Sequence, residues 1–386
     1  MYSDKKLNVG IIGTGFIGNG LLNVIRLLPD MQVSAVLTHR DPAGFDQPEL
    51  YTESVQKLID RSDLVAECSG DILYAAEVVA KVLQAGLPVV TMDAELQITA
   101  GTYLSTLGLL SEAEGDQPGA LAALGREVTA MGFRPLVYGN LKGFLNLNPT
   151  LEDMQYWAKV QGISLEQVTG FTDGTKVQIE AALVANGLGA AVAQQGLYGY
   201  ESLDVDEGSK RLAEAARSLG TPISDYLLCS PKAPRKFPAG VFITAEYGDN
   251  QAPALKYLKM GEGPFYTLVR NYHLCHIEIP KTIRMLMAGD VLLDNSAAPT
   301  ASVGAIAKHV LEPGTVIRRA DRNFAIRGEA LKIKGAPAHV PIGLMSDAVI
   351  VRRVEPGQLI DFADVELPDS LAQRAWGYTL GAAAGV

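Results

Sequence analysis

Along the first hundred residues, short apolar runs alternate with longer segments in which apolar residues recur every three or four positions. The short runs predict β-strands, and the longer segments predict α-helices. The predicted strands are "LNVGII", "VSAVLTHR", "DLVAECSG" and "LPVVTMDAE", and the helices between them include "FIGNGLLNVIRLL" and "ILYAAEVVAKVLQAG". Strands and helices that alternate at this spacing build a parallel, doubly wound sheet, so the sequence predicts an α/β fold.

Near the middle of the chain, "GFTDGTKVQIEAALVANGLGA" (170–190) predicts a helix that is apolar nearly all round after Ile179. Asp173, Lys176 and Glu180 are spaced by three and four residues, which places them on one helical face. An interior does not readily accept three ionisable groups, so they either form a structural cluster or face a cavity where chemistry occurs. In the structural alternative, Lys176 and Glu180 form a helix pair and Asp173 is an N-terminal cap.

From about Ala301 the pattern changes to short strands and turns, with two "EPG" turns at 312–314 and 355–357 that each precede a strand rich in valine or isoleucine. A chain of 386 residues is long enough for two or three domains. We therefore expect a dinucleotide-binding domain at 1–140, an α+β substrate and dimerisation domain at 141–298, and a small β-rich domain at 299–386.

Glycines at 13, 15 and 18 form a GxGxxG motif between the first predicted strand and the first helix. In that context the motif is typical of a Rossmann dinucleotide site: the first glycine permits a tight turn, the second admits a pyrophosphate, and the third lets the helix pack closely. The helix N-terminus also stabilises the anion. Ligands gather at the carboxyl ends of parallel strands, so the predicted cofactor-binding residues are Gly13, Gly15, Phe16, Ile17, Gly18, Ser69, Gly70 and Asp93.

The end of the second predicted strand indicates which cofactor is bound. NAD-binding sites usually carry an acidic residue there, whereas this chain has Thr38, His39 and Arg40. A hydroxyl, an imidazole and a guanidinium suit a 2′-phosphate, so we expect NADP to be the cofactor. Asp41 follows directly, and a shifted turn that used it would favour NAD.

Composition excludes several classes of partner. The net charge is −10 and no basic stripe is present, which argues against nucleic acid or an anionic membrane surface. Three widely spaced cysteines form neither a disulfide framework nor a paired metal-ligand motif. No apolar stretch is long enough to span a membrane, and a strand begins too early for a signal peptide. We expect a cytoplasmic protein, a homodimer or homotetramer, that acts on a small molecule.

Several segments resemble a known family. "IIGTGFIG", "DLVAECSG" and "VVTMDAE" resemble the cofactor domain of the homoserine dehydrogenase superfamily. "EGDQPG", "YGNLKG", "FTDGTKVQIEAALVAN" and "LKMGEGPFYTLVRNYHLCHIEIP" resemble its branch of 1-deoxy-D-xylulose 5-phosphate reductoisomerase-like (DRL-type) oxidoreductases. That branch carries a C-terminal SAF-type domain, which the two "EPG" segments resemble. In other proteins such a module contacts substrate or a neighbouring subunit; a role limited to stabilising a dimer is the alternative.

The resemblance implies an NADPH-dependent oxidoreductase and assigns roles within its substrate domain. Lys142 and Lys176 are the candidates for proton transfer, with the lysine pKa lowered by burial, and Asp173 and Glu180 orient the lysine or bind substrate hydroxyls. The predicted substrate-binding residues are Glu95, Asp116, Asn186 and His273. "YGNLKGFLN" is less basic than in those relatives, which weakens the case for a phosphorylated substrate.

If residues 273–276 formed a helix, the three-residue spacing of His273 and His276 would place both imidazoles on one face, where they could bind one metal ion. However, Ile277, Ile279 and Pro280 predict a strand, in which that spacing separates the rings, so we expect no metal. A core histidine is the alternative role for His273.

Three functions remain open at this point. The first is an NADPH-linked oxidoreductase acting on a small polar hydroxy-carbonyl or sugar-derived compound, with or without a skeletal rearrangement. The second is a simple dehydrogenase of a sugar acid, polyol or amino alcohol, and the third is a non-catalytic dinucleotide sensor or scaffold. The joint presence of Lys142, Asp173, Lys176 and Glu180 favours an enzyme, because a sensor needs none of them.

Overall fold

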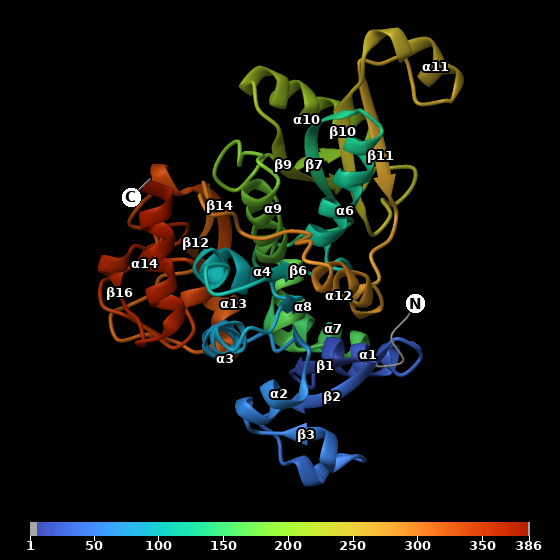
Figure 1. Cartoon of the computed structure of the whole chain (residues 1–386). Helices are drawn as coiled ribbons and strands as arrows, with labels where there is room; N and C mark the ends of the chain where they lie inside the picture. Colours follow the sequence, from blue (N-terminus) through green and yellow to red (C-terminus); the bar gives the residue numbers. More distant parts are fainter. Residues whose placement is uncertain (1–5, 385–386) are drawn as a thin grey trace.

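The N-terminal part of the chain folds around a six-stranded parallel sheet, in a computed structural model that describes residues 6–384 (Figure 1). The strand order is β3-β2-β1-β4-β5-β6. This confirms the predicted α/β fold with a doubly wound Rossmann sheet, in which the order reverses between β1 and β4. The strands are β1 (Leu7–Ile12), β2 (Met31–Leu37), β3 (Tyr51–Thr52), β4 (Leu64–Glu67), β5 (Val89–Thr91) and β6 (Leu110–Glu112).

Helices connect these strands much as the apolar periodicity predicts. The longest, α3, buries one continuous apolar face against the sheet. A short helix after β5 continues through a π-helical turn at Gln97–Gly101 into another short helix. The helices of this part are α1 (Phe16–Ile25), α2 (Val55–Arg61), α3 (Ile72–Gln84), α4 (Ala94–Leu96) and α5 (Thr102–Leu104).

A second, mixed sheet has the order β11-β10-β7-β9-β8, with β7 parallel to β9 and antiparallel to β10. Alternate side chains of β7 and β10 face opposite ways: Tyr138 and Ile243 pack with α6, whereas Val137 and Phe242 pack with α10. The elements are α6 (Gln117–Ala130), β7 (Arg134–Lys142), β8 (Tyr200–Ser202), α10 (Val205–Leu219), β9 (Ile223–Cys229), β10 (Val241–Glu246), α11 (Ala252–Tyr257) and β11 (Phe265–Arg270).

The chain returns to the Rossmann sheet after β11, through a segment that the sequence analysis predicted incorrectly. Residues 277–280 are not a strand: a 3-10 turn at Cys275–Ile277 leads into α12 (Ile279–Met287). Pro280 is well tolerated in the first turn of a helix. Ile279, Ile283 and Leu286 recur at helical spacing and join the core beneath β1 and β4.

Three consecutive helices connect β7 to β8: α7 (Leu151–Gln161), α8 (Leu165–Thr172) and α9 (Thr175–Gly187). Helix α9 runs through the middle of the molecule (Figure 1), and nearly every one of its residues is buried. Gly174 separates α8 from α9 in the left-handed region, with φ of +84°. The predicted apolar helix is therefore present, but Asp173 belongs to the end of the preceding helix.

The C-terminal module contains the short strands and turns that the sequence predicts, and two helices that it does not, the short α13 and the longer α14. Gly314 and Gly357, at the two "EPG" turns, have φ of +88° and +80°. The unpredicted helix α14 packs its buried Trp376 into the same core as α3 and α9. The elements are β12 (Ala301–Ala307), β13 (Val316–Ile317), α13 (Arg322–Ala325), β14 (Ile326–Lys332), β15 (Ala348–Ile350), β16 (Val365–Glu366) and α14 (Leu371–Ala384).

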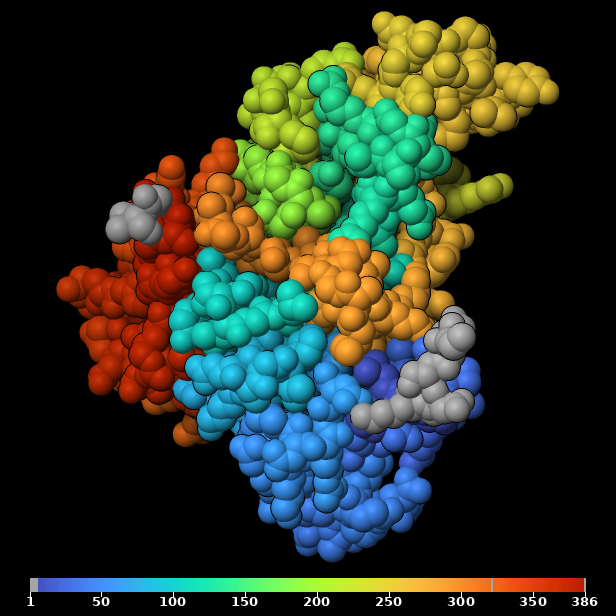
Figure 2. Space-filling view, in the orientation of Figure 1, coloured from blue at the N-terminus to red at the C-terminus, as the bar shows by residue number. Residues whose placement is uncertain are grey.

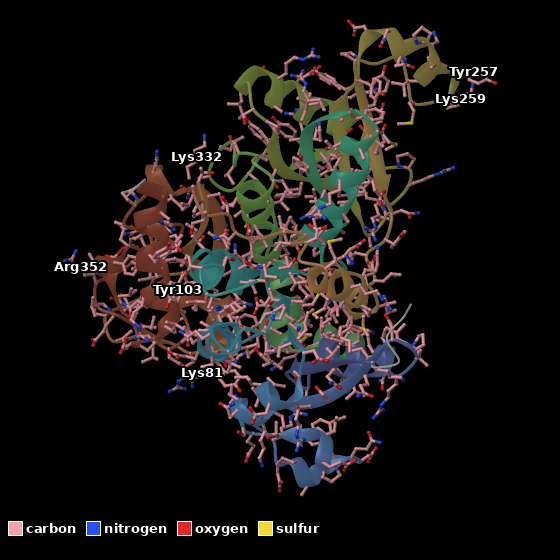
Figure 3. The ribbon with its side chains drawn as sticks, in the orientation of Figure 1. Lys81, Tyr103, Tyr257, Lys259, Lys332 and Arg352 are labelled. Atoms are coloured by element: carbon pink, nitrogen blue, oxygen red, sulfur yellow. The ribbon has the colours of Figure 1, made fainter. Side chains whose placement is uncertain are left out.

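In the space-filling view, the Rossmann part, the second sheet with its helices, and the C-terminal module form three masses around a common centre (Figure 2). Tyr257 and Lys259 project from the tip of the second mass, far from that centre (Figure 3). None of the helices within residues 6–384 combines the length and apolar character that a membrane span requires.

Candidate active site

The glycine motif forms an open cradle at the N-terminus of α1. Gly13 has φ of +100°, and a Cβ there would lie 2.8 Å from the Cys68 carbonyl oxygen. A Cβ at Gly18 would lie 2.2 Å from the Gly13 carbonyl oxygen, so the helix packs closely against the loop. A Cβ at Gly15 would meet no atom within 4 Å. The space above Gly15 therefore fits a pyrophosphate that approaches the helix N-terminus.

A cleft of about 400 Å³ extends from this cradle across the carboxyl ends of β4 and β5. It lies where the strand order reverses, which is where ligands bind in sheets of this kind. Residues from all three parts of the chain line it, and they include Gly15, Phe16, Ile17, Ser69, Gly70, Asp93, Glu95, Asp116, Phe171, Lys176, Cys275, Arg319 and Arg322. Of the predicted cofactor-binding residues, Gly15, Phe16, Ile17, Ser69, Gly70 and Asp93 are thus brought together.

Buried acids support the strand ends beneath this cleft. Ser69 donates from both its backbone N–H and its hydroxyl to Glu67 Oε1, each at 2.6 Å, and Thr91 donates to Glu67 Oε2 at 2.8 Å. Asp93 caps α4 by accepting from the N–H groups of Glu95 and Leu96. Burial, followed by repulsion from Glu67 and Glu95, raises the pKa of Asp93 to about 8.

The residues predicted to select NADP follow the end of β2. The Thr38 hydroxyl accepts from the Arg40 N–H at 3.1 Å, and the His39 ring lies 4.3 Å from the Tyr74 ring. Arg40 is exposed, and its guanidinium has no ion-pair partner within residues 6–384. Asp41 accepts from the Ala43 N–H and caps the 3-10 turn at Pro42–Gly44, so its carboxylate is already engaged.

Two lysines converge on one fully buried carboxylate, Glu180. Lys176 Nζ lies 3.5 Å from Glu180 Oε1 and 2.6 Å from Asp116 Oδ2. Lys142 Nζ lies 3.3 Å from Glu180 Oε2 and 2.8 Å from Gln117 Oε1. The Asn140 amide also donates to Glu180 Oε2, at 2.9 Å. Three segments that are separate in sequence, residues 116–117, the end of β7 and the first two turns of α9, therefore build this cluster.

The balance of charge keeps Lys176 protonated. Burial alone would lower its pKa, but the carboxylates of Asp116 and Glu180 outweigh burial and raise the pKa of Lys176 above its ordinary value. The pKa of Asp116 is conversely lowered: burial acts to raise it, and the Lys176 ammonium overcomes that effect. The predicted lowering of the lysine pKa thus fails here, because two carboxylates rather than one contact the ammonium.

Asp173 does not join this cluster. Because the chain reverses at Gly174, the Asp173 carboxylate points to the C-terminal module, where Lys308 Nζ donates to Asp173 Oδ2 at 2.6 Å. Asp173 Oδ1 accepts from the Thr175 N–H, and both members of the ion pair are buried. The helical spacing that predicted a shared face applies only within one helix, and Asp173 lies outside α9.

Asn186 also lies away from the cleft, near the other end of α9. Its side-chain amide donates to Asn295 Oδ1 at 2.8 Å and to the Ala301 carbonyl at 2.9 Å. Its oxygen accepts from the N–H groups of Thr300 and Ala301, each at 2.9 Å. All of its hydrogen-bonding groups hold the connection into β12, so Asn186 has an architectural role.

The two histidines occupy different environments. His273 is half-buried, its charge contributes to the lowered pKa of Asp116, and its Nδ1 has no hydrogen-bond partner within the described residues. His276 packs edge-on against Phe16, and burial lowers the pKa of its imidazole. Within residues 6–384, no group of three or more His, Cys, Asp or Glu side chains is arranged to hold a metal ion.

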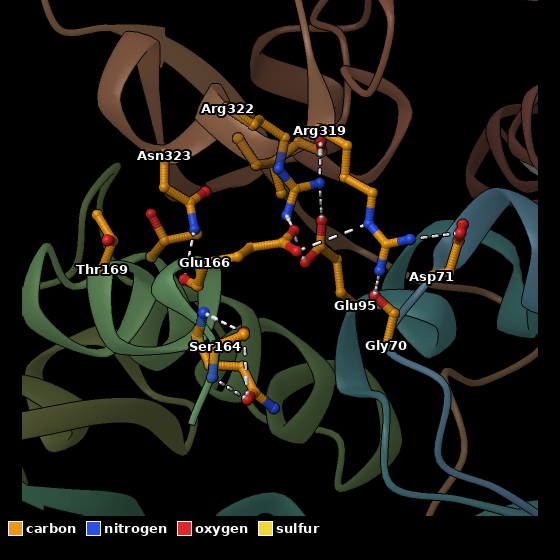
Figure 4. Close-up of polar contacts among 12 residues, drawn as sticks. Gly70, Asp71, Glu95, Ser164, Glu166, Thr169, Arg319, Arg322 and Asn323 are labelled. Atoms are coloured by element: carbon orange, nitrogen blue, oxygen red, sulfur yellow. Dashed lines mark hydrogen bonds and ion pairs between the residues drawn. The ribbon is translucent and has the colours of Figure 1, made fainter. Parts of the chain in front are cut away.

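Two arginines of the C-terminal module, not among the residues predicted from the sequence, also reach this cleft (Figure 4). Arg322 binds Glu95 in a bidentate manner, at 2.7 and 3.1 Å, and lies 3.4 Å from Glu166. Arg319 pairs with Asp71 and donates to the Gly70 carbonyl at 2.8 Å. The cationic run "RRADR" (318–322) was the available signal. Glu95, predicted to bind substrate, therefore lines the cleft with Arg322 already bound to it.

Comparisons with known families agree with this geometry. Residues 13–116 match the family model of the homoserine dehydrogenase NAD-binding domain, and residues 115–279 match that of the catalytic domain of oxidoreductase DRL. The chain is an oxidoreductase with a DRL-type catalytic domain. The matches confirm the predicted family and an NAD(P)-linked enzyme, and the catalytic-domain match spans Asp116, Lys142, Lys176 and Glu180.

Solved structures similar to this oxidoreductase include several dehydrogenases. A probable dehydrogenase from Thermotoga maritima is 14% identical, with 74% of this chain and 90% of that chain covered and a TM-score of 0.42. A UDP-N-acetylglucosamine 3-dehydrogenase from Acidithiobacillus ferrooxidans is 13% identical, with 75% and 92% covered and a TM-score of 0.44. The scyllo-inositol dehydrogenase from Lactobacillus casei, with bound NAD(H) and scyllo-inositol, is 10% identical, with 75% and 92% covered and a TM-score of 0.43. No curated protein sequence matches the chain significantly.

Proposed function

We propose that this oxidoreductase transfers a hydride between NADP(H) and a CH–OH or carbonyl carbon of a small polar hydroxy-carbonyl or sugar-derived compound. One observation carries the proposal: Lys176 and Asp116 line the same cleft as Gly15 and Phe16 of the cofactor cradle. A proton-donating group and a dinucleotide cradle in one cleft are the two parts that reduction of a carbonyl needs.

Lys176 is the proposed proton carrier. A bound nicotinamide supplies or accepts the hydride at the substrate carbon. In the reducing direction, the Lys176 ammonium stabilises the negative charge that develops on the substrate oxygen and gives that oxygen a proton, so the product is a neutral alcohol. Because Asp116 and Glu180 raise its pKa, Lys176 is charged and ready to donate at neutral pH.

Lys142 and Glu180 lie behind Lys176 and support it. Glu180 lies between the two ammonium groups, 3.5 Å from Lys176 and 3.3 Å from Lys142. The geometry supports a role for Glu180 in orienting Lys176, and for Lys142 in returning a proton to Lys176 through Glu180. Half-buried His273, beside Asp116, is a proposed hydrogen-bonding partner of the substrate.

NADP is the proposed cofactor, and Arg40 gives the test. Replacing Arg40 with alanine is expected to weaken NADPH binding by about 1.5–3 kcal/mol, the cost of losing a charge-assisted bond to the 2′-phosphate, and to leave NADH binding unchanged. Fluorescence titration with both cofactors measures this. The matched control is Lys81→Ala, which removes a cation that projects from α3 into solvent (Figure 3). Equal affinity of the wild-type protein for the two cofactors, or tighter NADH binding, would refute the preference.

A homodimer or homotetramer in the cytoplasm is also proposed. Helix α7 supports the assembly, because Tyr156, Trp157 and Val160 are exposed large apolar side chains on one short helix. Sedimentation of the purified protein measures its mass, and a monomer at micromolar concentration would contradict the proposal.

An SAF-type identity of the C-terminal module remains a proposal, supported by its two "EPG" turns.

The proposed reaction is tested with C4-deuterated NADPH and a panel of sugars, sugar acids, sugar phosphates and hydroxy-ketones. Mass spectrometry detects deuterium in the product, and carbon NMR of the product separates simple reduction from reduction with rearrangement. Deuterium transfer with unchanged carbon connectivity would favour the simple dehydrogenase. Tight NADPH binding without transfer to any compound of the panel would favour the sensor.

A further inference from the structure

The C-terminal module contains an internal repeat. Residues 312–321 read "EPGTVIRRAD" and residues 355–364 read "EPGQLIDFAD", so both follow the pattern E-P-G-x-x-I-x-x-A-D. The structures of the two copies correspond: each has a glycine in the left-handed region at its third position and ends in a 3-10 turn, at Arg319–Asp321 and at Phe362–Asp364.

The two copies differ in charge at corresponding positions. Arg319 of the first copy corresponds to Phe362 of the second. Arg322, the residue directly after the first copy, corresponds to Val365, the residue directly after the second. Phe362 and Val365 pack into or against the main hydrophobic core. The second copy thus builds the same turn without a cation, so the turn itself does not require the two arginines.

The arginines belong to the copy that faces the cofactor cleft. Arg319 reaches the loop after β4, where it pairs with Asp71 and donates to the Gly70 carbonyl (Figure 4). By contrast, Arg352 of the same module points outward into solvent (Figure 3). The loop after β4 lies beside the glycine loop after β1, at the point where the strand order reverses. Arg319 therefore lies over the crevice in which a dinucleotide binds such a sheet.

The two arginines differ in how firmly they are held. Arg322 is 3% exposed and is fixed between Glu95 and Glu166. The Arg319 side chain is 39% exposed. It pairs with Asp71, which is 32% exposed, and lies 3.6 Å from Glu166, a carboxylate that it shares with Arg322. Asp71 also caps α3 by accepting from the Tyr74 N–H, so it keeps a partner when Arg319 moves away. Arg319 can therefore exchange its partner, whereas Arg322 acts as an anchor.

We propose that Arg319 leaves Asp71 to bind the pyrophosphate of the bound dinucleotide, which makes the C-terminal module part of the cofactor site. Arg322 is a positioning residue that holds the turn against Glu95 and Glu166. A guanidinium forms paired hydrogen bonds with phosphate oxygens, whereas a solvent-exposed ion pair contributes little to stability. This inference rests on the dinucleotide binding in the proposed function, but not on its substrate.

The test titrates NADPH and ADP-ribose into wild-type protein and into Arg319→Ala, Arg319→Lys and Arg318→Ala. Arg319→Ala is expected to weaken both ligands by about 10- to 100-fold, the usual effect of losing a hydrogen bond to a charged group. Arg319→Lys is expected to recover part of the affinity. Arg318→Ala is the matched control, since Arg318 is exposed and adjacent, and it should bind as wild type. Weakening of NADPH without weakening of ADP-ribose would overturn the assignment to the pyrophosphate.

A second variant separates binding from architecture. Asp71→Asn keeps the helix cap but removes the charge that competes for Arg319. We expect it to bind NADPH as tightly as wild type or up to about tenfold more tightly. The alternative is that Arg319 only holds the module against the Rossmann domain. In that case Asp71→Asn and Arg319→Ala would both lower the melting temperature, and Arg319→Ala would bind NADPH with wild-type affinity. That result would overturn the inference. Absence of NADPH and NADH binding in the wild-type protein would instead refute the proposed function.

Discussion

Replacing Lys176 with methionine is expected to lower turnover by about 10²- to 10⁴-fold, the usual scale for losing a general acid or base. Cofactor affinity should stay close to that of wild type, because Lys176 contacts Asp116 and Glu180 rather than the glycine loop. Methionine keeps the apolar stem of the side chain and removes the ammonium. Single-turnover kinetics with saturating NADPH measures the chemical step directly.

The same variant also reports on stability. Breaking a buried ion pair commonly costs about 3–5 kcal/mol, because a charge is left uncompensated. Here the cost should be smaller, since Glu180 keeps Lys142 and Asn140 as partners. A large fall in melting temperature with normal activity per folded molecule would mean that the cluster is only architectural. Lys142→Met is the control: it removes the other ammonium from Glu180 but no group that lines the cleft, so its turnover should fall less.

Replacing Gly15 with valine is expected to abolish cofactor binding and leave the protein folded. The backbone at Gly15, with φ of −79° and ψ of −167°, suits a branched residue, and a Cβ there meets no protein atom within 4 Å. The valine would instead occupy the space that a pyrophosphate needs above the helix N-terminus. Since each hydrogen bond to a charged group is worth about 1.5–3 kcal/mol, loss of two backbone donors should weaken binding by roughly 100-fold or more.

Two glycines serve as controls for that experiment. Gly335→Val adds the same side chain to open space in the C-terminal module and should change neither folding nor binding. Gly13→Ala places a Cβ 2.8 Å from the Cys68 carbonyl at a φ of +100°, so it should destabilise the fold itself. A Gly15→Val protein with a wild-type circular dichroism spectrum and unimpaired NADPH titration would contradict the assignment of the cradle.

The fold could be predicted because its signals are local. Apolar periodicity over ten residues distinguishes α3 from β4, and the three glycines identify the turn between β1 and α1. The secondary structure predicted from the sequence was wrong where one residue changes the local backbone geometry or where the apolar pattern suits two kinds of element. Gly174 divides the predicted continuous helix, and residues 277–280 contain isoleucines that suit either a strand or a helix.

The site could be predicted only in part, because its charges pair over long distances in sequence. Lys176 and Glu180 are one turn apart, so helical spacing found them. Arg322 and Glu95 are 227 residues apart, and Lys308 and Asp173 are 135 apart, so no local pattern connects them. Such pairs form because the C-terminal module folds back onto both the Rossmann domain and helix α8, which depends on tertiary packing.

Because the C-terminal module packs against the N-terminal domain, the N-terminal domain cannot complete its core until the end of the chain has been synthesised. Helix α14 closes the surface of α3 and α5, and the Leu371 N–H donates to Glu77, 294 residues earlier in the chain. At ribosomal rates of about 5–20 residues per second, α3 waits roughly 15–60 s before its covering helix is made. During that time the nascent Rossmann domain exposes the apolar surface that helix α14 later covers. The N-terminal domain can therefore begin to fold first but is among the last parts to be completed.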